Sequence, residues 1–237
     1  MPFSYKKFIT LPLMRQHKKC AEMLRNDDLQ SYKEVAGWLD FPCPKETSEA
    51  ISNRYHEHMK QAGRTLKEHN LLPRITKEDR KNGEEPWPIV IFLDQLRSAH
   101  NVGSILRTIE ALRLGTVALS KDTPGPDSKQ VQNTSMGAWQ WVGCEKIELE
   151  NLPRPIIALE TSLDAEPLDT FVFPQSFTLV VGNEEFGLSE KSLGLADHLV
   201  QIPLRGRKNS LNVACAFAMA AQEIASQRRD YAAKPAS

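Results

Sequence analysis

The feature that most constrains the fold is a series of short, almost purely apolar segments between residues 88 and 228, which alternate with stretches of helical spacing. The short segments are rich in β-branched residues and do not alternate between apolar and polar positions. Strands of that kind are buried on both faces, as in a parallel sheet covered by helices on each side. The expected strands are 88–94, 116–120, 154–160, 177–183 and 198–203, and the expected helices are 101–115, 128–139, 188–195 and 209–228. We therefore predict an α/β fold with a mostly parallel sheet.

The first third of the chain has a different character. Residues 1–85 are polar and mainly helical in pattern, which predicts a small helical N-terminal extension before a main domain at 86–237. The charged segment 76–88 contains an Asn-Gly pair and two prolines, a composition typical of a linker or turn. Residues 1–85 also carry a small excess of basic residues, and the remainder a matching acidic excess. Such an asymmetry points to a basic end that binds a partner.

Two helices are expected in this extension. One spans Met14 to Leu39. The other begins near Thr47 or Ser48, where an N-cap residue precedes helical charge spacing.

Bulk composition excludes few functions. The 237 residues are 41% hydrophobic and 25% charged, with a net charge of zero, and a local basic patch matters more to RNA binding than that total. The chain has no run of about 18 apolar residues and no secretory h-region, so we expect a cytoplasmic protein without a membrane span. Its four cysteines lack Cys-x-x-Cys spacing, which predicts reduced thiols and no metal site. They are Cys20, Cys43, Cys144 and Cys215.

The first segment whose residues could take part in binding or catalysis follows the expected strand at 88–94. Asn101 stands where a strand–loop–helix turn ends, and Gly103 would let another backbone approach the first helical turn. Arg107 follows one turn later on the same side of the helix, away from its apolar stripe. The simpler interpretation is an ordinary turn in which Asn101 caps the helix and Arg107 is a surface residue.

The second segment is 180–190, VVGNEEFGLSE, directly after an apolar strand. Gly182 and Gly187 allow tight turns, and a loop at the carboxyl end of a parallel strand is the usual place for a ligand. Glu184 is the acid most tightly bracketed by these glycines, although Glu184 and Glu185 could equally be solvated turn residues. The pattern is neither Gly-x-Gly-x-x-Gly nor a Walker loop, so it does not indicate a phosphate cradle.

The third segment, 202–224, runs from a strand through a basic loop into an alanine-rich helix. Asn209 and Ser210 are expected to open the helix, and either of them could simply cap it. Alternatively, the segment Ser210-Leu211-Asn212 faces a bound ligand with its backbone N–H groups and side chains. The stretch 212–221 is apolar on every side, so it must be buried in a domain core or at a subunit interface. The basic residues of the loop are Arg205, Arg207 and Lys208.

Taken together and in this order, the three segments resemble the SpoU (TrmH) family of SPOUT methyltransferases over residues 88 to 228. The first motif is matched by Asn101, Gly103 and Arg107. The second is matched by Gly182, Glu184, Gly187 and Leu188, and the third by Ile202, Pro203, Ser210, Leu211, Asn212 and Val213. Gly137-Ala138 supplies a Gly-Ala pair also typical of the family. One departure is Ser98-Ala99-His100, where the family often has Asp-Pro.

The resemblance implies a deep trefoil knot in the C-terminal part of the sheet, with loops 182–188 and 202–212 holding S-adenosylmethionine. It also implies a homodimer with the apolar C-terminal helix at the interface. We expect RNA as the substrate, bound in part by Arg205, Arg207 and Lys208, with no membrane and no metal involved. The expected cofactor contacts are Leu159, Glu160, Val181, Gly182, Asn183, Gly187, Ile202, Leu204, Ser210 and Leu211.

The activity that the resemblance implies is methyl transfer to a ribose 2′-hydroxyl in tRNA or rRNA. The implied catalytic residues are Asn101, Arg107, Glu184, Ser210 and Asn212. The family proposal makes Arg107 the base, but a guanidinium stays protonated in proteins. We therefore expect Arg107 to stabilise the developing alkoxide and a neighbouring phosphate, while a phosphate oxygen or water takes the proton. Two alternatives stay open: a non-catalytic RNA-binding or ribosome-assembly protein with this fold, and an RNA base methyltransferase.

Overall fold

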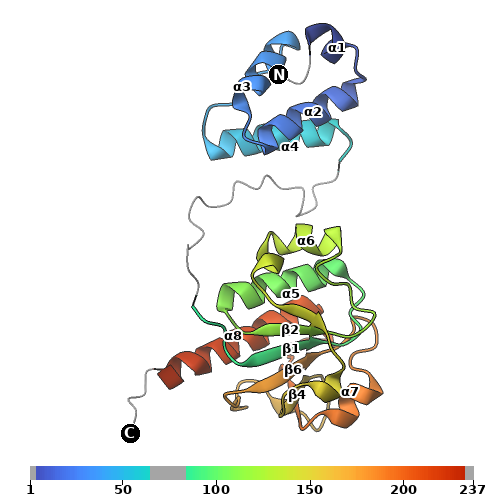
Figure 1. The fold of residues 1–237 in the computed structure, drawn as a ribbon, viewed down its shortest axis with the longest axis vertical. Helices are drawn as coiled ribbons and strands as arrows, with labels where there is room; N and C mark the ends of the chain where they lie inside the picture. The colour runs from blue at the N-terminus through green and yellow to red at the C-terminus, as the bar shows by residue number, and fades with distance from the viewer. Residues whose placement is uncertain (1–3, 65–83, 233–237) are drawn as a thin grey trace. The chain divides into compact units, whose positions relative to one another are not determined.

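The computed structural model describes residues 4–64 and 84–232 of the chain (Figure 1). These residues belong to two compact units, Met1–Lys81 and Asn82–Ser237, and each is described by itself. Most of the expected linker at 76–88, including its Asn-Gly pair, lies outside the described residues.

The first unit contains four helices: α1 (Tyr5–Ile9), α2 (Leu13–Arg25), α3 (Leu29–Trp38) and α4 (Ser48–Gln61). The prediction of one helix from Met14 to Leu39 is wrong, because the chain breaks between α2 and α3. At the break Asp27 adopts a positive φ of 57°, and the Asp28 carboxylate accepts a hydrogen bond from the Ser31 backbone N–H at 3.1 Å. Short acidic side chains favour such caps over helix interiors.

The predicted start of the second helix is confirmed. Thr47 is the N-cap of α4, and its hydroxyl accepts a hydrogen bond from the Ala50 backbone N–H at 3.2 Å. The helix ends at Gln61, and Gly63 follows with a φ of +65°. Residues 65–69, which the sequence pattern included, lie outside the described residues.

A buried polar chain crosses the core of this helical unit. The Arg54 Nε–H donates to the Tyr32 hydroxyl at 2.8 Å, and that hydroxyl lies 2.9 Å from His58 Nε2. His58 Nδ1 lies 2.8 Å from His17 Nδ1. Because the guanidinium can only donate, the donors are all satisfied when Tyr32 donates to His58 and His58 donates to His17. Burial, with a smaller contribution from Arg54, lowers the pKa of His58 to about 3, so His58 is neutral near pH 7.

The second unit is an α/β domain built on a seven-stranded sheet in the order β3-β2-β1-β6-β4-β7-β5, with every pair parallel. The prediction of a mostly parallel sheet is confirmed. The strands are β1 (Ile89–Leu93), β2 (Thr116–Leu119), β3 (Cys144–Lys146), β4 (Ile156–Leu159), β5 (Glu166–Pro167), β6 (Phe177–Val181) and β7 (His198–Gln201). Sequence reasoning missed β3 and β5, which are short, polar edge strands without an apolar run.

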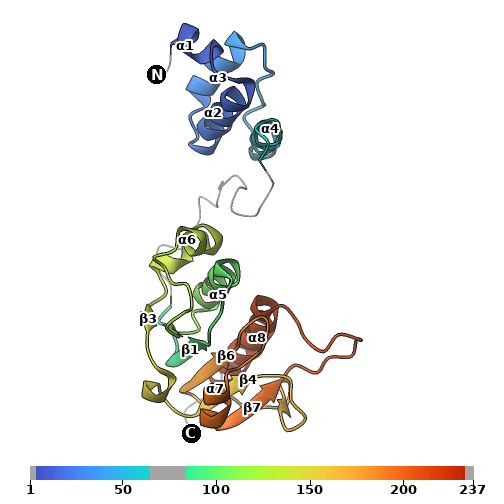
Figure 2. The same cartoon turned by 90° about the vertical axis from the view of Figure 1, so that its right-hand side faces the viewer.

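Helices cover both faces of the sheet, which explains the continuously apolar strands. On β6, Leu179 and Val181 face the cluster that contains the core residues of α5 (Ala99–Leu112) and α8 (Val213–Ala232). Val180, between them, faces a second cluster that includes part of α7 (Glu190–Leu195). Figure 2 shows α5 and α8 side by side. The remaining helices are α6 (Lys129–Ser135), η2 (Ala138–Gln140) and η3 (Leu149–Asn151).

One expectation about α8 is corrected. The helix begins at Val213 rather than at 209, and its N-terminal cap is Asn212, whose side-chain oxygen accepts from the Ala214 and Cys215 backbone N–H groups at 3.0 and 3.3 Å. The single chain buries only one face of α8, so of the two expected environments the domain core accounts for that face alone, and burial of the other face at a subunit interface stays a prediction. Its inner face is in the core, whereas Cys215 is exposed and Met219 keeps 48% of its surface accessible.

Among the helices in the described part of the chain, none is long and apolar enough to cross a membrane.

Candidate functional site

The carboxyl ends of four parallel strands meet at one edge of the sheet. Val181 at the end of β6 pairs with Leu93 of β1 on one side and with Leu159 of β4 on the other. Leu159 in turn pairs with Val200 of β7. The loops that leave these strands therefore start at the same level, which is where open parallel sheets bind ligands.

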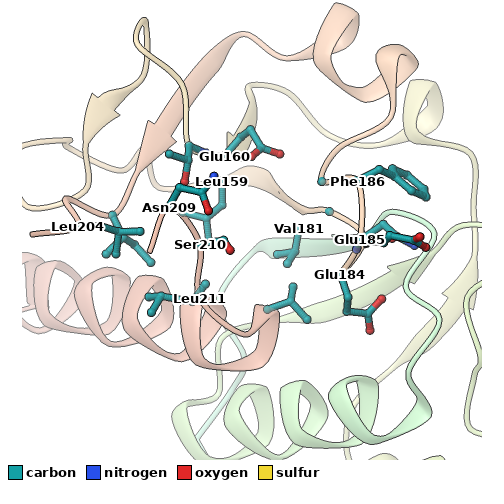
Figure 3. Close-up of a pocket in the computed structure, with 17 residues that line it drawn as sticks. Leu159, Glu160, Val181, Glu184, Glu185, Phe186, Leu204, Asn209, Ser210 and Leu211 are labelled. Atoms are coloured by element: carbon teal, nitrogen blue, oxygen red, sulfur yellow. Dashed lines mark hydrogen bonds between the residues drawn. The ribbon is translucent and has the colours of Figure 1, made fainter. Parts of the chain in front are cut away.

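A cavity of about 460 Å³ lies among these loops (Figure 3). In Figure 3, Asn209 and Ser210 stand on one side and the Glu184–Phe186 segment on the other. All ten residues expected to contact the cofactor line this cavity: Leu159, Glu160, Val181, Gly182, Asn183, Gly187, Ile202, Leu204, Ser210 and Leu211. Sequence reasoning missed Thr161, Glu185, Phe186, Asn209, Val213 and Ala216, which also line it. Of these, Glu185 and Phe186 lie inside the second motif, so their place in the sequence could have identified them as residues of the site.

The 183–187 loop is tight and depends on its two glycines. The backbones of Asn183 and Gly187 exchange hydrogen bonds at 2.8 and 3.0 Å, and Gly187 has a φ of +75°. A Cβ on Gly182 would lie 2.5 Å from the Gly187 carbonyl carbon, so the close approach of the backbones at the two ends of the loop requires glycine at position 182. The Glu160 carboxylate accepts from the Leu188 backbone N–H at 3.0 Å and ties the end of the loop to β4.

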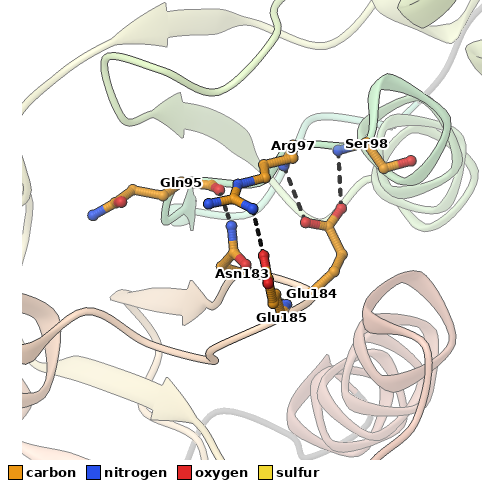
Figure 4. Close-up of polar contacts among 6 residues, drawn as sticks. All are labelled: Gln95, Arg97, Ser98, Asn183, Glu184 and Glu185. Atoms are coloured by element: carbon orange, nitrogen blue, oxygen red, sulfur yellow. Dashed lines mark hydrogen bonds and ion pairs between the residues drawn. The ribbon is translucent and has the colours of Figure 1, made fainter.

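Glu184 joins this loop to the first motif (Figure 4). Its carboxylate accepts hydrogen bonds from the backbone N–H groups of Arg97 and Ser98 at 3.0 and 3.1 Å, and from the Asn101 side-chain amide at 2.9 Å. Burial opposes ionisation, but these donors outweigh it and hold the pKa of Glu184 below its usual value. The carboxylate is therefore charged and fixed in position.

Asn101 continues the connection to the third motif. Its side-chain oxygen accepts from the Asn212 amide at 3.2 Å. Because Asn101 is the third residue of α5, the cap of that helix is Ser98, whose hydroxyl accepts from the Asn101 backbone N–H at 3.3 Å. The interpretation of Asn101 as a plain N-cap is therefore wrong. Glu184, Asn101 and Asn212 form one hydrogen-bonded line through all three motifs.

A second cavity of about 590 Å³ adjoins the first along this line. Both volumes fall within the range of about 300–1,000 Å³ typical of small-molecule sites. The residues lining the second cavity are Arg97, Ser98, Asn101, Asn183, Glu184, Glu185, Leu211, Asn212 and Val213, five of which also line the first.

The other predicted residues have varied surroundings. A Cβ on Gly103 would lie 2.9 Å from the Ser135 backbone nitrogen, which confirms that a second backbone approaches α5 here. Arg107 is exposed one turn further along α5, and neither of the two cavities described includes it. The basic residues Arg205, Arg207 and Lys208 are exposed in the loop before α8. Within the ranges that the structure describes, no three metal-ligating side chains are grouped as a metal site requires.

Comparison with known proteins finds one family model and several relatives, all of them named as RNA methyltransferases. The model of the SpoU rRNA Methylase family matches residues 88–222. The chain is 29% identical over 154 residues to the 23S rRNA (guanosine-2'-O-)-methyltransferase RlmB of Acinetobacter baylyi, covering 59% of this chain and 60% of the relative. It is 28% identical over 151 residues to the tRNA (guanosine(18)-2'-O)-methyltransferase of Aquifex aeolicus, covering 60% and 71%.

Solved structures resemble the same part of the chain. The AdoMet-bound rRNA methyltransferase from Sinorhizobium meliloti superposes with a TM-score of 0.55 at 25% identity, over 62% of this chain and 59% of that one. The chain thus spans about 60% of the length of two of these three relatives.

Proposed function

The chain belongs to the SpoU rRNA Methylase family, and on that premise we propose that it transfers the methyl group of S-adenosylmethionine to a ribose 2′-hydroxyl of tRNA or rRNA. Two relatives named as 2'-O-methyltransferases, one of 23S rRNA and one of tRNA, support the reaction class. The observation that carries the proposal is the line Glu184–Asn101–Asn212, which joins the three motifs and lines the second of two adjoining cavities, with Glu184 lining both. A transferase needs such a pair of sites, one for each reactant.

The first cavity suits S-adenosylmethionine. The buried side chains of Val181 and Ile202 give it apolar walls, while Gly182 and Gly187 let the backbone come close to a ligand. Asn209 and Ser210 supply polar groups on the opposite side. Bound there, S-adenosylmethionine would supply an electrophilic methyl group on its sulfonium.

The second cavity would then receive the ribose. In the transfer, an O–C bond to the methyl group would form as the S–CH3 bond breaks, with S-adenosylhomocysteine as the leaving group, and the 2′-hydroxyl would lose its proton. The chain must therefore hold the hydroxyl in line with the S–CH3 bond and help the proton leave. Asn101 acts as a positioning residue, because its amide is already held by Glu184 and Asn212. Ser210 lines the transfer site.

Arg107 is assigned electrostatic stabilisation. Its guanidinium keeps its charge throughout the working pH range, so it stabilises the developing alkoxide and an adjacent phosphate rather than accepting the proton. The proton leaves to a phosphate oxygen or to water. Since Arg107 lines neither cavity, this role requires the RNA or a second subunit to bring the reacting atoms to it.

RNA is the substrate because only RNA offers a 2′-hydroxyl. Arg205, Arg207 and Lys208 are exposed beside the first cavity, where they would bind phosphates irrespective of sequence. We also assign RNA binding to the helical N-terminal extension within 1–85 and cytoplasmic action to the protein. Deleting residues 1–80 should weaken RNA binding more than cofactor binding, and equal RNA affinity would make the extension purely structural.

The proposal includes the knot and the homodimer that the family resemblance implies. The knot is supported by the placement of the two loops that would form it: Gly182–Gly187 and Asn209–Leu211 line the same cavity, and Asn212 donates to Asn101 on α5. The homodimer is supported by the apolar exposed face of α8, where Cys215 and Met219 are accessible in the single chain. Sedimentation analysis of Met219→Glu tests it, because a buried charge at the interface should yield monomers.

The decisive experiment is transfer of labelled methyl from S-adenosylmethionine to unmodified tRNA and rRNA, followed by digestion to nucleosides. A labelled 2′-O-methylnucleoside would support the proposal, and the labelled fraction would identify the class of RNA. A labelled base would instead indicate a base methyltransferase. Binding of both RNA and cofactor without transfer would indicate the non-catalytic RNA-binding protein.

A further inference from the structure

An aromatic ring at the site has no role in the reaction proposed above. Phe186 lies at the tip of the 183–187 loop and keeps 50% of its surface exposed. The Arg97 guanidinium lies over the ring, 5.8 Å from its centroid. Phe186 borders the first cavity and Arg97 the second, so the pair lies at the rim of both.

Both members of this pair are held in place. The Arg97 backbone N–H donates to Glu184 at 3.0 Å, and its guanidinium pairs with Glu185. The Glu185 backbone N–H donates to the Asn183 side chain at 2.8 Å, inside the closed loop that carries Phe186. The loop that carries the ring is thus closed by its own backbone hydrogen bonds, which lowers the conformational entropy lost when a ligand binds to it.

The charges around the ring favour a neutral, planar ligand. The ion pair with Glu185 balances Arg97, and Glu184 adds a negative charge that its donors stabilise. A phosphate would be repelled here, whereas the exposed cations of the basic loop directly precede Asn209, which lies on the opposite side of the cavity. A nucleobase, by contrast, stacks well on an aromatic ring that a guanidinium backs.

We propose that Phe186, backed by Arg97, is the stacking platform for an unpaired nucleobase next to the methylated ribose. The inference rests on the proposed function and specifies how the RNA is placed. The base lies on the exposed side of the ring, its phosphates extend toward the basic loop, and the ribose enters the second cavity. Stacking is indifferent to base identity, so the platform orients the strand without selecting its sequence.

The test compares Phe186→Leu, which keeps an apolar side chain but removes the ring, with Phe186→Tyr, which keeps the ring. Val172→Ala is the matched control, since Val172 is 70% exposed and lines neither cavity. Loss of one base–aromatic stack corresponds to about 5- to 150-fold weaker binding. We expect Phe186→Leu to raise KM for the methylated RNA fraction within this range, and to change kcat and S-adenosylmethionine affinity much less than it changes KM. Phe186→Tyr and Val172→Ala should behave like the unaltered chain.

A second measurement separates this inference from the proposed function. Binding of a short fluorescein-labelled single-stranded RNA to the full chain does not require transfer. If the chain binds this RNA but methylates none, the proposed activity fails, and weaker binding by Phe186→Leu still supports the platform. The platform is overturned if Phe186→Leu binds RNA as tightly as the unaltered chain. It is equally overturned if cofactor affinity falls as much as RNA affinity, because Phe186 would then be a cofactor contact.

Discussion

Replacing Gly103 by alanine tests whether the first motif depends on close packing between α5 and α6. In an exposed helix interior, the change from glycine to alanine stabilises by about 0.5–1 kcal/mol. At Gly103 the added Cβ would lie 1.9 Å from Thr134 Oγ1 and 2.9 Å from the Ser135 backbone nitrogen. Thr134 cannot easily turn away, because its hydroxyl already donates to the Gln130 carbonyl at 2.8 Å.

The steric effect should outweigh the gain in helix propensity. Overpacking a buried contact typically destabilises by about 1–3 kcal/mol. Because the added Cβ would lie only 1.9 Å from Thr134 Oγ1, the cost falls in the upper part of this range, about 2–3 kcal/mol. Subtracting the propensity gain leaves a net loss of about 1–2.5 kcal/mol, which corresponds to a fall in Tm of about 2–10 °C for a domain of this size. Because α6 must shift away from α5, and Asn101 lies half a turn before Gly103, methyl transfer should fall as well.

Gly194→Ala is the matched control. Gly194 is exposed on α7 in the same unit, and a Cβ there would meet no atom within 4 Å. Differential scanning calorimetry of the full chain should show the Tm of the α/β unit unchanged or slightly raised by Gly194→Ala and lowered by Gly103→Ala. A Gly103→Ala protein as stable as the unaltered chain would refute the reasoning, since it would mean that α6 accommodates the methyl group freely.

Three further predictions concern the site and the helical unit. Arg107→Ala should abolish methyl transfer while S-adenosylmethionine binding, measured by calorimetry, stays largely intact; retained activity would remove Arg107 from the mechanism. Asn101→Ala and Asn212→Ala should be coupled by about 0.5–3 kcal/mol in a double-mutant cycle of unfolding free energy, because they share a hydrogen bond; additive effects would contradict the connected line. His58 has a pKa of about 3 when folded and about 6.5 when unfolded, so the unfolded chain takes up the proton first as pH falls. The helical unit should therefore lose about 2 kcal/mol between pH 7 and pH 5, a loss that His58→Gln should largely remove in acid titrations of Tm.

The local pattern of the sequence was enough to predict the five inner strands of the sheet. β1 and β6 are apolar on both faces because helices cover both faces of the sheet, and burial on both faces favours apolar residues at consecutive positions of the strand. The edge strands β3 and β5 have no such apolar run, since their polar residues face solvent. Their pairing depends on partner strands that are distant in the sequence. The break between α2 and α3 was readable in Asp27 and Asp28, whose capping preference outweighs the helical spacing around them.

The motifs indicated which loops form the candidate site through their resemblance to the SpoU family, and their glycines and carboxylate at fixed spacing are local requirements of a tight turn. Only the tertiary structure decided what those residues touch. Glu184 and Asn101 are 83 positions apart and Asn101 and Asn212 are 111 apart, and no local pattern encodes a hydrogen bond across such separations. The same holds for Phe186. In the sequence it is indistinguishable from other apolar residues, and only the fold shows that Arg97 lies over its ring. Side-chain periodicity records burial along one element, whereas a site is made where the ends of several elements converge.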